Sequence, residues 1–262
     1  MTKRNFPSHN RLWQLDALRG ITLISMAAYH ALWDLVYLFG LRADWYSDTP
    51  GYLWQQSICW CFILLSGFCW GLGKHPLKRG LMVFFGGALV TAVTFLVMPA
   101  ERVVFGVLTL IGSSMLLMIP LHKLLGKIPP KYAPFGILAA GLLFFITRNI
   151  SRGSLGFEGI HLRTIPAAFY QNIFTAYLGF PPREFFSTDY FPLFPWFFLF
   201  LTGYFIHRSL SPWIQRKRES ENLSPAPAAA KPFCWIGRHS LILYLVHQPV
   251  IYGICEAVRM IL

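Results

Sequence analysis

A histidine and an aspartate lie four residues apart inside an apolar stretch of this chain. His30 and Asp34 fall within residues 18–39, a run that is long and apolar enough to cross a bilayer as one helix. The spacing places both side chains on one face of that helix. A charged group at membrane depth costs about 2.5–3.5 kcal/mol, so it usually faces a cavity or a partner. An imidazole with a carboxylate one turn away has the composition of a general base with its orienting residue.

The depth of His30 supports a functional role, although a structural role is equally compatible with the spacing. A rise of about 1.5 Å per residue puts His30 roughly 16 Å beyond Arg19, near the middle of the bilayer. Two residues are a weak motif, and the same side chains could tie this helix to its neighbours by hydrogen bonds. The spacing alone therefore leaves a catalytic pair and a packing pair open.

The last apolar run, residues 234–258, carries a second polar set. Arg238 and His239 stand at its start, and His247 lies nine residues beyond Arg238, about 14 Å deeper. Pro249 leaves an earlier carbonyl of the helix without its donor, which provides an additional acceptor beside His247. Taken alone, His247 is more simply explained as a hydrogen-bonding residue between helices.

Two histidines at matched depth change this interpretation. In a topology of seven spans the first and last helices run in the same direction, so His30 and His247 reach similar depths. Together with Asp34 they favour a reaction centre or a proton path. A metal site is not expected, because the three residues match no metal-binding spacing. The candidate catalytic residues are therefore His30, Asp34 and His247.

Composition predicts the fold that positions these residues. The chain has 262 residues, of which 55% are hydrophobic and 13% charged, which is typical of an all-α polytopic membrane protein. The net charge of +12 does not indicate nucleic-acid binding, because the basic residues fall in the gaps between apolar runs. About seven transmembrane helices are expected. The predicted spans are residues 18–39, 52–73, 81–98, 103–121, 133–147, 190–207 and 234–258.

The distribution of Lys and Arg predicts a cytoplasmic N-terminus. With seven spans and the N-terminus inside, 16 of the 23 Lys and Arg residues fall on the cytoplasmic side. The positive-inside rule therefore favours this orientation and places the C-terminus outside. The plasma (inner) membrane is the expected location. The basic residues on the outer side are all arginine: Arg42, Arg102, Arg148, Arg152, Arg163, Arg183 and Arg259.

A single integral membrane domain is expected over residues 1–262. Its parts are a five-helix segment (14–147), an external loop (148–189) and a two-helix segment (190–262) with a cytoplasmic linker (209–231). The external loop includes FYQNIFTAYLGF, an amphiphilic piece predicted to lie at the interface or to re-enter the membrane. All five cysteines fall inside or at the ends of apolar runs, which is typical of buried apolar residues and not of a disulfide framework.

Further candidates carry charged or polar groups near the membrane boundaries. Cationic side chains at the predicted cytoplasmic ends could hold the phosphates of a nucleotide-containing ligand, although such residues more often only set topology. These are Arg19, Arg238, Lys74 and Arg79. Asp189 precedes two prolines at the start of the sixth predicted span, where it could cap that helix or bind a polar acceptor. The candidates for acceptor binding are Asp16, Asp189, Trp196 and Gln248.

Four stretches of the chain resemble the heparan-α-glucosaminide N-acetyltransferase-like membrane family, part of the broader group of transmembrane acyltransferases. They are LDALRGITLISMAAYHALWDL, FGVLTLIGSSMLL, DYFPLFPWFFLFLTGYFIHR and IGRHSLILYLVHQPV. They occur in the family's order and span most of the chain, and together they are far more specific than the opening D-x-x-R-G pattern. The resemblance implies transfer of an acetyl or other acyl group from cytoplasmic acetyl-CoA, or another acyl-CoA, to an amino sugar or similar acceptor at the outer face.

The chain departs from this family at one point. In the lysosomal branch the catalytic histidine lies in the loop after the first helix, whereas this sequence has no histidine between His30 and His75. His30 would then take that role from within the helix, with Asp34 as its orienting residue. Heparan itself is not expected as the acceptor.

A proton-coupled transporter or channel is the alternative from a different functional class. In that case His30, Asp34 and His247 relay protons or bind a solute. Transporters often consist of two similar halves with broken helices. This chain shows no internal repeat, and seven spans do not divide evenly, which argues mildly against that class. The expected partners are the lipid bilayer, acyl-CoA and the acceptor; a homodimer is left open.

Overall fold

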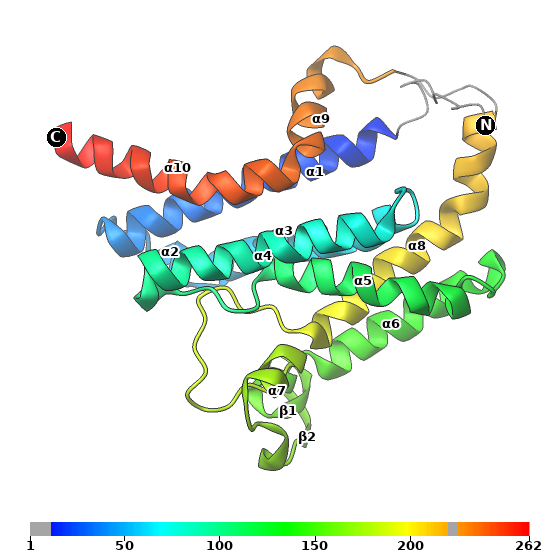
Figure 1. The fold of residues 1–262 in the computed structure, drawn as a ribbon, viewed down its shortest axis with the longest axis horizontal. Coiled ribbons are helices and arrows are strands. Elements are labelled where there is room, and N and C mark those ends of the chain that lie inside the picture. The colour runs from blue at the N-terminus through cyan, green and yellow to red at the C-terminus, as the bar shows by residue number, and fades with distance from the viewer. Residues whose placement is uncertain (1–11, 220–224, 262) are drawn as a thin grey trace. The chain divides into compact units, whose positions relative to one another are not determined.

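The computed structural model describes residues 12–219 and 225–261, which are mostly helical (Figure 1). Internal contacts divide the chain into two compact units. Unit 1 consists of residues 1–62 and 213–262, and unit 2 consists of residues 63–212. Both boundaries fall inside long helices, α3 (Thr49–Trp70) and α8 (Leu193–Glu219).

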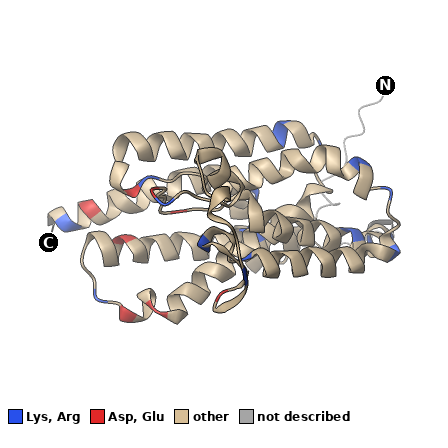
Figure 2. Cartoon of the chain, turned by 90° about the horizontal axis from the view of Figure 1, so that it is seen from below, with Lys and Arg blue, Asp and Glu red and all other residues tan. Residues whose placement is uncertain are grey.

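Six helical segments of the described residues are long and apolar enough to cross a membrane, which confirms the predicted all-α polytopic membrane fold. Charged residues lie mostly near helix ends and in the connections, and the middle turns of the long helices largely lack them (Figure 2). This distribution fits a bilayer core that excludes charge. The six segments are Trp13–Leu38, Thr49–Trp70, Pro76–Val97, Val107–Leu125, Pro130–Arg152 and Ser240–Met260.

The sixth predicted span falls on α8, which is not among these six segments. Its aromatic first half is followed by basic residues such as Arg208 and Arg216, so a count of seven spans stays a prediction. Because α8 extends to Glu219, the first part of the predicted linker 209–231 is helical. Residues 220–224 of that linker, and the N-terminal residues 1–11, lie outside the described residues.

The seventh predicted span is two helices instead of one. α9 (Lys231–Arg238) and α10 (Ser240–Ile261) separate at His239, whose backbone angles (φ −100°, ψ 16°) lie outside the helical range. The apolar run of the sequence continues through this break, which is why hydropathy does not detect it. The consequence is that Arg238 and His247 belong to different helices.

Unit 1 is organised around α1 (Trp13–Trp33), which continues as a π-helical turn over Asp34–Leu38. α1 packs against both α9 and α10. The short α2 (Asp44–Ser47) precedes α3. Leu23 and Met26 of α1 form a buried cluster with Ile58 of α3, and aromatic side chains surround it. This cluster supplies the apolar core against which the polar residues of α1 are held.

α1 and α9 approach so closely that only glycine fits at the contact. A Cβ atom on Gly20 would lie 2.0 Å from the carbonyl oxygen of Phe233, and one on Gly237 would lie 1.9 Å from the carbonyl oxygen of Asp16. Small residues that let backbones touch are a common basis of helix packing in membranes. The contact brings the motif LDALRG beside the motif IGRHS, although more than two hundred residues separate them.

Unit 2 contains α4 (Pro76–Val97), α5 (Val107–Leu125), α6 (Ala133–Thr147) and the first part of α8. α6 has the bounds predicted for the fifth span. The predicted external loop forms an antiparallel hairpin of β1 (Ser154–Phe157) and β2 (Ile160–Thr164), followed by α7 (Ile173–Leu178). α7 has six residues and rises about 9 Å, so it is too short to cross a membrane by itself.

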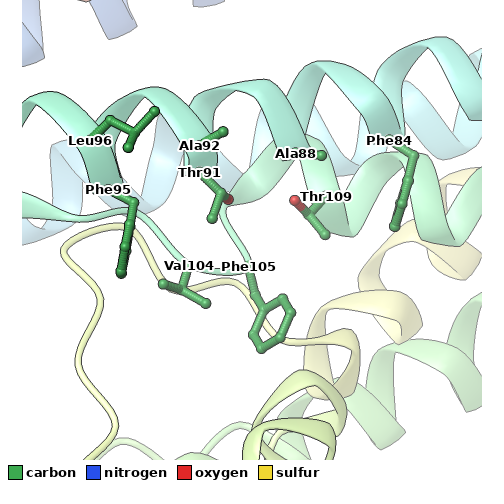
Figure 3. A pocket seen from close by; sticks show the side chains of 9 residues that line it. All are labelled: Phe84, Ala88, Thr91, Ala92, Phe95, Leu96, Val104, Phe105 and Thr109. Carbon is green, nitrogen blue, oxygen red and sulfur yellow. The ribbon is translucent and has the colours of Figure 1, made fainter. Parts of the chain in front are cut away.

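Unit 2 also holds an apolar cavity of about 500 Å³ beside α4 (Figure 3). Phe84, Thr91 and Phe95 of α4 line it together with Phe105 from the connection to α5. The hydroxyl of Thr91 already donates to the carbonyl oxygen of Gly87 over 3.2 Å. The cavity therefore offers apolar surface and no side chain suited to acid–base chemistry.

Candidate functional site

Two arginines share one carboxylate at the start of α1. The Nε atom of Arg238 lies 3.3 Å from Oδ2 of Asp16, and Nη1 of Arg19 lies 3.6 Å from Oδ1 of Asp16. Arg19 also donates to the carbonyl oxygen of Gly237 over 3.4 Å. Two guanidinium groups against one carboxylate leave a net positive charge, on a surface where Arg238 is about half exposed. Asp16, a candidate for acceptor binding, is thus the shared counter-ion of the two cations.

Further along α1, His30 lies beside His247 of α10. The two ring centroids are 5.0 Å apart and the ring planes are inclined by 59°. The packing of α1 against α10 produces this contact. The two rings meet at the same level along the paired helices, as counting residues predicts. The depth of both histidines in a membrane and their part in catalysis stay predictions.

One nitrogen of His247 is held by the backbone of its own helix. Its Nδ1 atom lies 2.5 Å from the carbonyl oxygen of Tyr244. Because a carbonyl oxygen only accepts, Nδ1 carries the proton, and the neutral ring keeps a lone pair on Nε2. Nε2 is buried and has no hydrogen-bond partner among the described residues. His247 therefore has the tautomer and the free lone pair of a general base.

Asp34 is fully buried (0% exposed) where α1 changes into the π-helical turn. Its Oδ1 atom accepts a hydrogen bond of 2.7 Å from Nε2 of Gln248. The sequence predicts Asp34 as the orienting partner of His30, but the bond in the structure joins it to the residue after His247. A buried carboxylate needs donors, and the amide on the facing helix supplies one. Single π-helical turns are frequent at functional sites.

Three hydrogen-bond acceptor atoms on the facing sides of α1 and α10 are buried and have no hydrogen-bond partner among the described residues. They are Oδ2 of Asp34, Nε2 of His247 and Oε1 of Gln248. Asp34 bonds to Gln248, and His247 contacts His30 one turn earlier on α1, so the three atoms lie along one contact between α1 and α10, which we call the acceptor locus. Buried polar groups are nearly always paired with protein, water or ligand. A set of acceptors suits a ligand that brings N–H or O–H donors.

The predicted cationic residues Lys74 and Arg79 lie in unit 2. Lys74 belongs to the connection between α3 and α4, and Arg79 to the first turn of α4. The guanidinium of Arg79 fills the space beside Gly73, where a Cβ atom would lie 1.5 Å from Nη1. The glycine thus lets the loop fold against the arginine. Binding of a phosphate-containing ligand by these two residues stays a prediction.

Asp189 caps a different helix from the one predicted. Its Oδ2 atom accepts from the backbone N–H of Val107, the first residue of α5, over 3.4 Å. The chain before α8 passes this helix end, as the bond from the N–H of Phe191 to the carbonyl oxygen of Phe105 (2.8 Å) shows. Burial raises the pKa of Asp189 to about 6, although the hydrogen bond from Val107 opposes the shift.

Trp196 is a packing residue of unit 2. Its side chain is 4% exposed and lies against the rings of Phe144 and Phe191. The guanidinium carbon of Arg148 sits 4.8 Å from the centre of one of its rings. No exposed face of the indole supports the predicted role in acceptor binding, which stays a prediction.

Sequence reasoning misses a row of aromatic side chains that leads to His30. The ring of Tyr29 meets the ring of His30 edge to face at 6.0 Å, and the ring of Tyr46 in α2 lies 4.9 Å from Tyr29. The hydroxyl of Tyr46 donates to the carbonyl oxygen of Tyr29 over 3.1 Å, and burial raises its pKa. The signal available in the sequence is the pair Trp45 and Tyr46 in a short polar loop.

The helices and the acceptor locus define a polytopic membrane protein with a polar centre inside its apolar helices. The chain matches the family model of heparan-alpha-glucosaminide N-acetyltransferase, catalytic, over residues 11–249. It belongs to this family, which confirms the resemblance carried by the four sequence stretches. Family membership supports a membrane acetyltransferase-type function. No curated protein and no solved structure matches the chain.

Proposed function

We propose that this protein transfers an acyl group from acyl-CoA to the amine of a sugar-like acceptor, with His247 as the general base. The observation that carries the proposal is the acceptor locus of Asp34, His247 and Gln248, whose three buried acceptor atoms have no donor within the described part of the chain. An amine brings N–H donors and is the nucleophile of N-acyl transfer. The family match supports the reaction class.

The proposed step moves one proton through His247. The amine nitrogen bonds to the thioester carbonyl carbon, the carbon–sulfur bond breaks, and Nε2 of His247 takes the proton that the amine gives up. That proton then passes to the leaving sulfur. The carbonyl oxygen of Tyr244 holds the Nδ1 proton and so keeps Nε2 as the basic atom. Of the two N–H groups of a neutral primary amine, one gives its proton to His247, and a free oxygen of Asp34 or Gln248 holds the other.

His30 has a second role in this proposal. Its ring lies 5.0 Å from that of His247, centroid to centroid, and can donate an N–H to the carbonyl oxygen of the acyl group as that oxygen gains charge. Two adjacent imidazoles resist being charged together, so His30 stays neutral while His247 holds the proton. This assignment differs from the sequence-based prediction of His30 as the base. Of these two histidines, His247 is the one with a described backbone bond that sets its tautomer.

The acyl-CoA is proposed to bind at the start of α1, where Arg19 and Arg238 present a net positive charge. This point lies roughly 16 Å along α1 from His30, a distance that the extended pantetheine arm of CoA can bridge. In the predicted orientation, with the protein in the plasma membrane, this start of α1 faces the cytoplasm. Reporter fusions test the sides: one after Lys127 should report the cytoplasm, and one after Gly156 the outside.

The decisive experiment uses the full chain in proteoliposomes, with acetyl-CoA as donor and glucosamine as the amine probe. Released CoA thiol and acetylated amine are both measured. His247→Ala should lower kcat by about 10²–10⁴-fold, the usual range for one acid–base residue. His239→Ala is the matched control, because Nδ1 of His239 also lies near a backbone carbonyl oxygen (2.9 Å from that of Trp235) but the side chain is exposed.

Two other outcomes point elsewhere. If His247→Ala keeps full acyl transfer and His30→Ala loses it, His30 is the general base. Wild-type protein that releases no CoA thiol with any amine, yet carries protons across the vesicle, would support the transporter alternative.

A further inference from the structure

The apolar cavity of unit 2 extends along one side of α4. Phe84 and Phe95 lie toward its two ends, and the small residues Ala88 and Ala92 lie between them (Figure 3). These residues recur every three or four positions, which keeps them on one side of the helix. The rise from Phe84 to Phe95 is about 17 Å along the helix axis. The cavity is therefore a groove, with room between the two rings because an alanine side chain is only a methyl group.

The wall that Val104 and Phe105 add to this groove is held from its far side. Phe105 has a φ of 57°, a left-handed conformation that a bulky residue rarely adopts. Its carbonyl oxygen accepts the N–H of Phe191 over 2.8 Å, and its ring lies 5.3 Å from that of Tyr177. The N–H of Val104 donates to the hydroxyl of Ser187 over 2.9 Å. These contacts fix the wall in advance, as in a preformed binding site.

Part of the groove lies on the exposed surface of α4. This helix is one of the segments long and apolar enough to cross a membrane. Phe95 is 60% exposed, and Leu96, which also lines the cavity, is 80% exposed. The exposed surface of a spanning helix meets lipid hydrocarbon, so an acyl chain is the species that reaches this groove. One leaflet contributes about 15 Å of hydrocarbon, which is close to the length of the groove.

A cation lies near the same end of α4 as Phe95. Arg102 belongs to the connection between α4 and α5, two residues before Val104. Its guanidinium carbon lies 5.2 Å from the centre of the Phe186 ring, and its Nη1 donates to the carbonyl oxygen of Pro99 over 3.3 Å. Within the described part of the chain no carboxylate pairs with it. Connections between spanning helices lie at the level of the lipid headgroups, where phosphate is the anion that an arginine binds well.

We propose that the groove binds one acyl chain of a membrane phospholipid and that Arg102 holds the phosphate of the same lipid. The groove along α4 followed by a cation in the next connection matches the order of chain and headgroup in a phospholipid. A free fatty acid and a second copy of this chain are the other occupants that the experiment separates. The site lies within unit 2 and is independent of the acyl transfer proposed above.

The test uses the full chain in vesicles of phosphatidylcholine and phosphatidylglycerol, with a trace of phosphatidylglycerol that carries a diazirine on one acyl chain. Mass spectrometry after illumination measures labelling of the peptide that contains Val104 and Phe105, the wall of the groove. Ala92→Phe fills the groove and should lower this labelling about ten-fold, because displacing about two CH₂ groups already costs that factor. Ala88→Phe should act in the same way.

Val93→Phe is the matched control. It adds the same ring at the next position of α4, which is 45% exposed and does not line the cavity, so labelling of the wall should equal that of wild type. Equal labelling in wild type, Ala92→Phe and Val93→Phe would overturn the lipid site. Melting temperatures close to that of wild type show that the variants are folded.

Competition tests the phosphate contact. Unlabelled phosphatidylglycerol should displace the probe, and palmitate should do so much less well. Arg102→Gln should weaken probe binding by about five-fold, the contribution of one basic residue at an anionic membrane surface. Arg152→Gln is the control in the same unit, because Arg152 is an exposed arginine that pairs with Glu158. Equal competition by palmitate, with no effect of Arg102→Gln, would overturn the phosphate contact.

A third measurement addresses the second copy. Sedimentation of the purified chain in detergent gives its oligomeric state. If wild type shows no labelling of the wall and is a dimer that Ala92→Phe dissociates, the groove is an interface between copies and the lipid assignment is wrong. None of these measurements uses acyl transfer, so failure of the proposed function leaves their result unchanged.

Discussion

The side-chain amide of Gln248 donates a hydrogen bond of 2.7 Å to Oδ1 of Asp34, and this bond ties α10 to α1 beside the histidine pair. The glycine contact joins α1 to α9 by backbone packing, whereas this contact joins α1 to α10 by a hydrogen bond. Because the amide nitrogen faces the carboxylate, Oε1 of Gln248 and Oδ2 of Asp34 remain as acceptors. The same two residues therefore hold two helices together and shape the acceptor locus.

The coupling between Asp34 and Gln248 is measurable as a double-mutant cycle. Gln248→Leu leaves a buried carboxylate without its donor and should lower the free energy of unfolding by about 1–3 kcal/mol. Asp34→Leu together with Gln248→Leu should cost less than the sum of the two single changes, because neither partner is then left unpaired. Unfolding of the purified chain in detergent provides the values. Strict additivity would show that the bond contributes nothing.

The contact between α1 and α9 predicts a strong effect of one methyl group. Gly20→Ala places a Cβ atom 2.0 Å from the carbonyl oxygen of Phe233, so the helices must separate, at a cost of about 1–3 kcal/mol. Gly253→Ala in α10 is the matched control, since nothing lies within 4 Å of its Cβ position. It should be neutral or stabilise the helix slightly. Thermal unfolding in detergent compares the two, and equal melting temperatures would contradict the close contact.

The cationic end of α1 predicts salt-sensitive binding of CoA. Arg238→Gln should raise the Kd for CoA by about ten-fold at low ionic strength, since a hydrogen bond to a charged group is lost. The difference from wild type should shrink as salt is added, because screening already weakens the wild-type interaction. Arg259→Gln, at the far end of α10 and paired with Glu256, is the control. Isothermal titration calorimetry measures the Kd. The same Kd in wild type and Arg238→Gln would contradict CoA binding at this end of α1.

Asp189 predicts a pH dependence of stability with a definite sign. Its pKa in the folded chain is about 6, above the ordinary value of 3.8, so the folded state holds the proton more tightly than the unfolded state. Its contribution to stability is therefore complete below about pH 4 and is lost as pH rises through 6, by about 3 kcal/mol. Asp189→Asn can still accept the N–H of Val107 and should abolish this dependence. The readout is the difference in melting temperature between the two proteins from pH 4 to 7; a constant difference would refute the shift.

The sequence alone determines the features of this protein that depend on neighbouring residues. Apolar runs separated by basic gaps predict the polytopic helical fold, and the short run at residues 133–147 predicts α6 with its observed bounds. Counting residues along two parallel helices predicts that His30 and His247 lie at the same level, where their rings meet. These predictions hold because hydropathy, spacing and helical rise are local properties. The four family-like stretches likewise predict the family without a structure.

Only the tertiary structure decides which distant segments meet. The partner of Asp34 is Gln248, and Asp189 caps α5, because in both cases the tertiary fold brings a donor from a distant segment to the carboxylate. The break at His239 and the aromatic row from Tyr46 to His30 also depend on contacts between helices, which leave no periodic signal in the sequence. The assignment of His247 as the proposed base follows from a lone pair left free after all nearby bonds are formed, and that is a property of the packed helices.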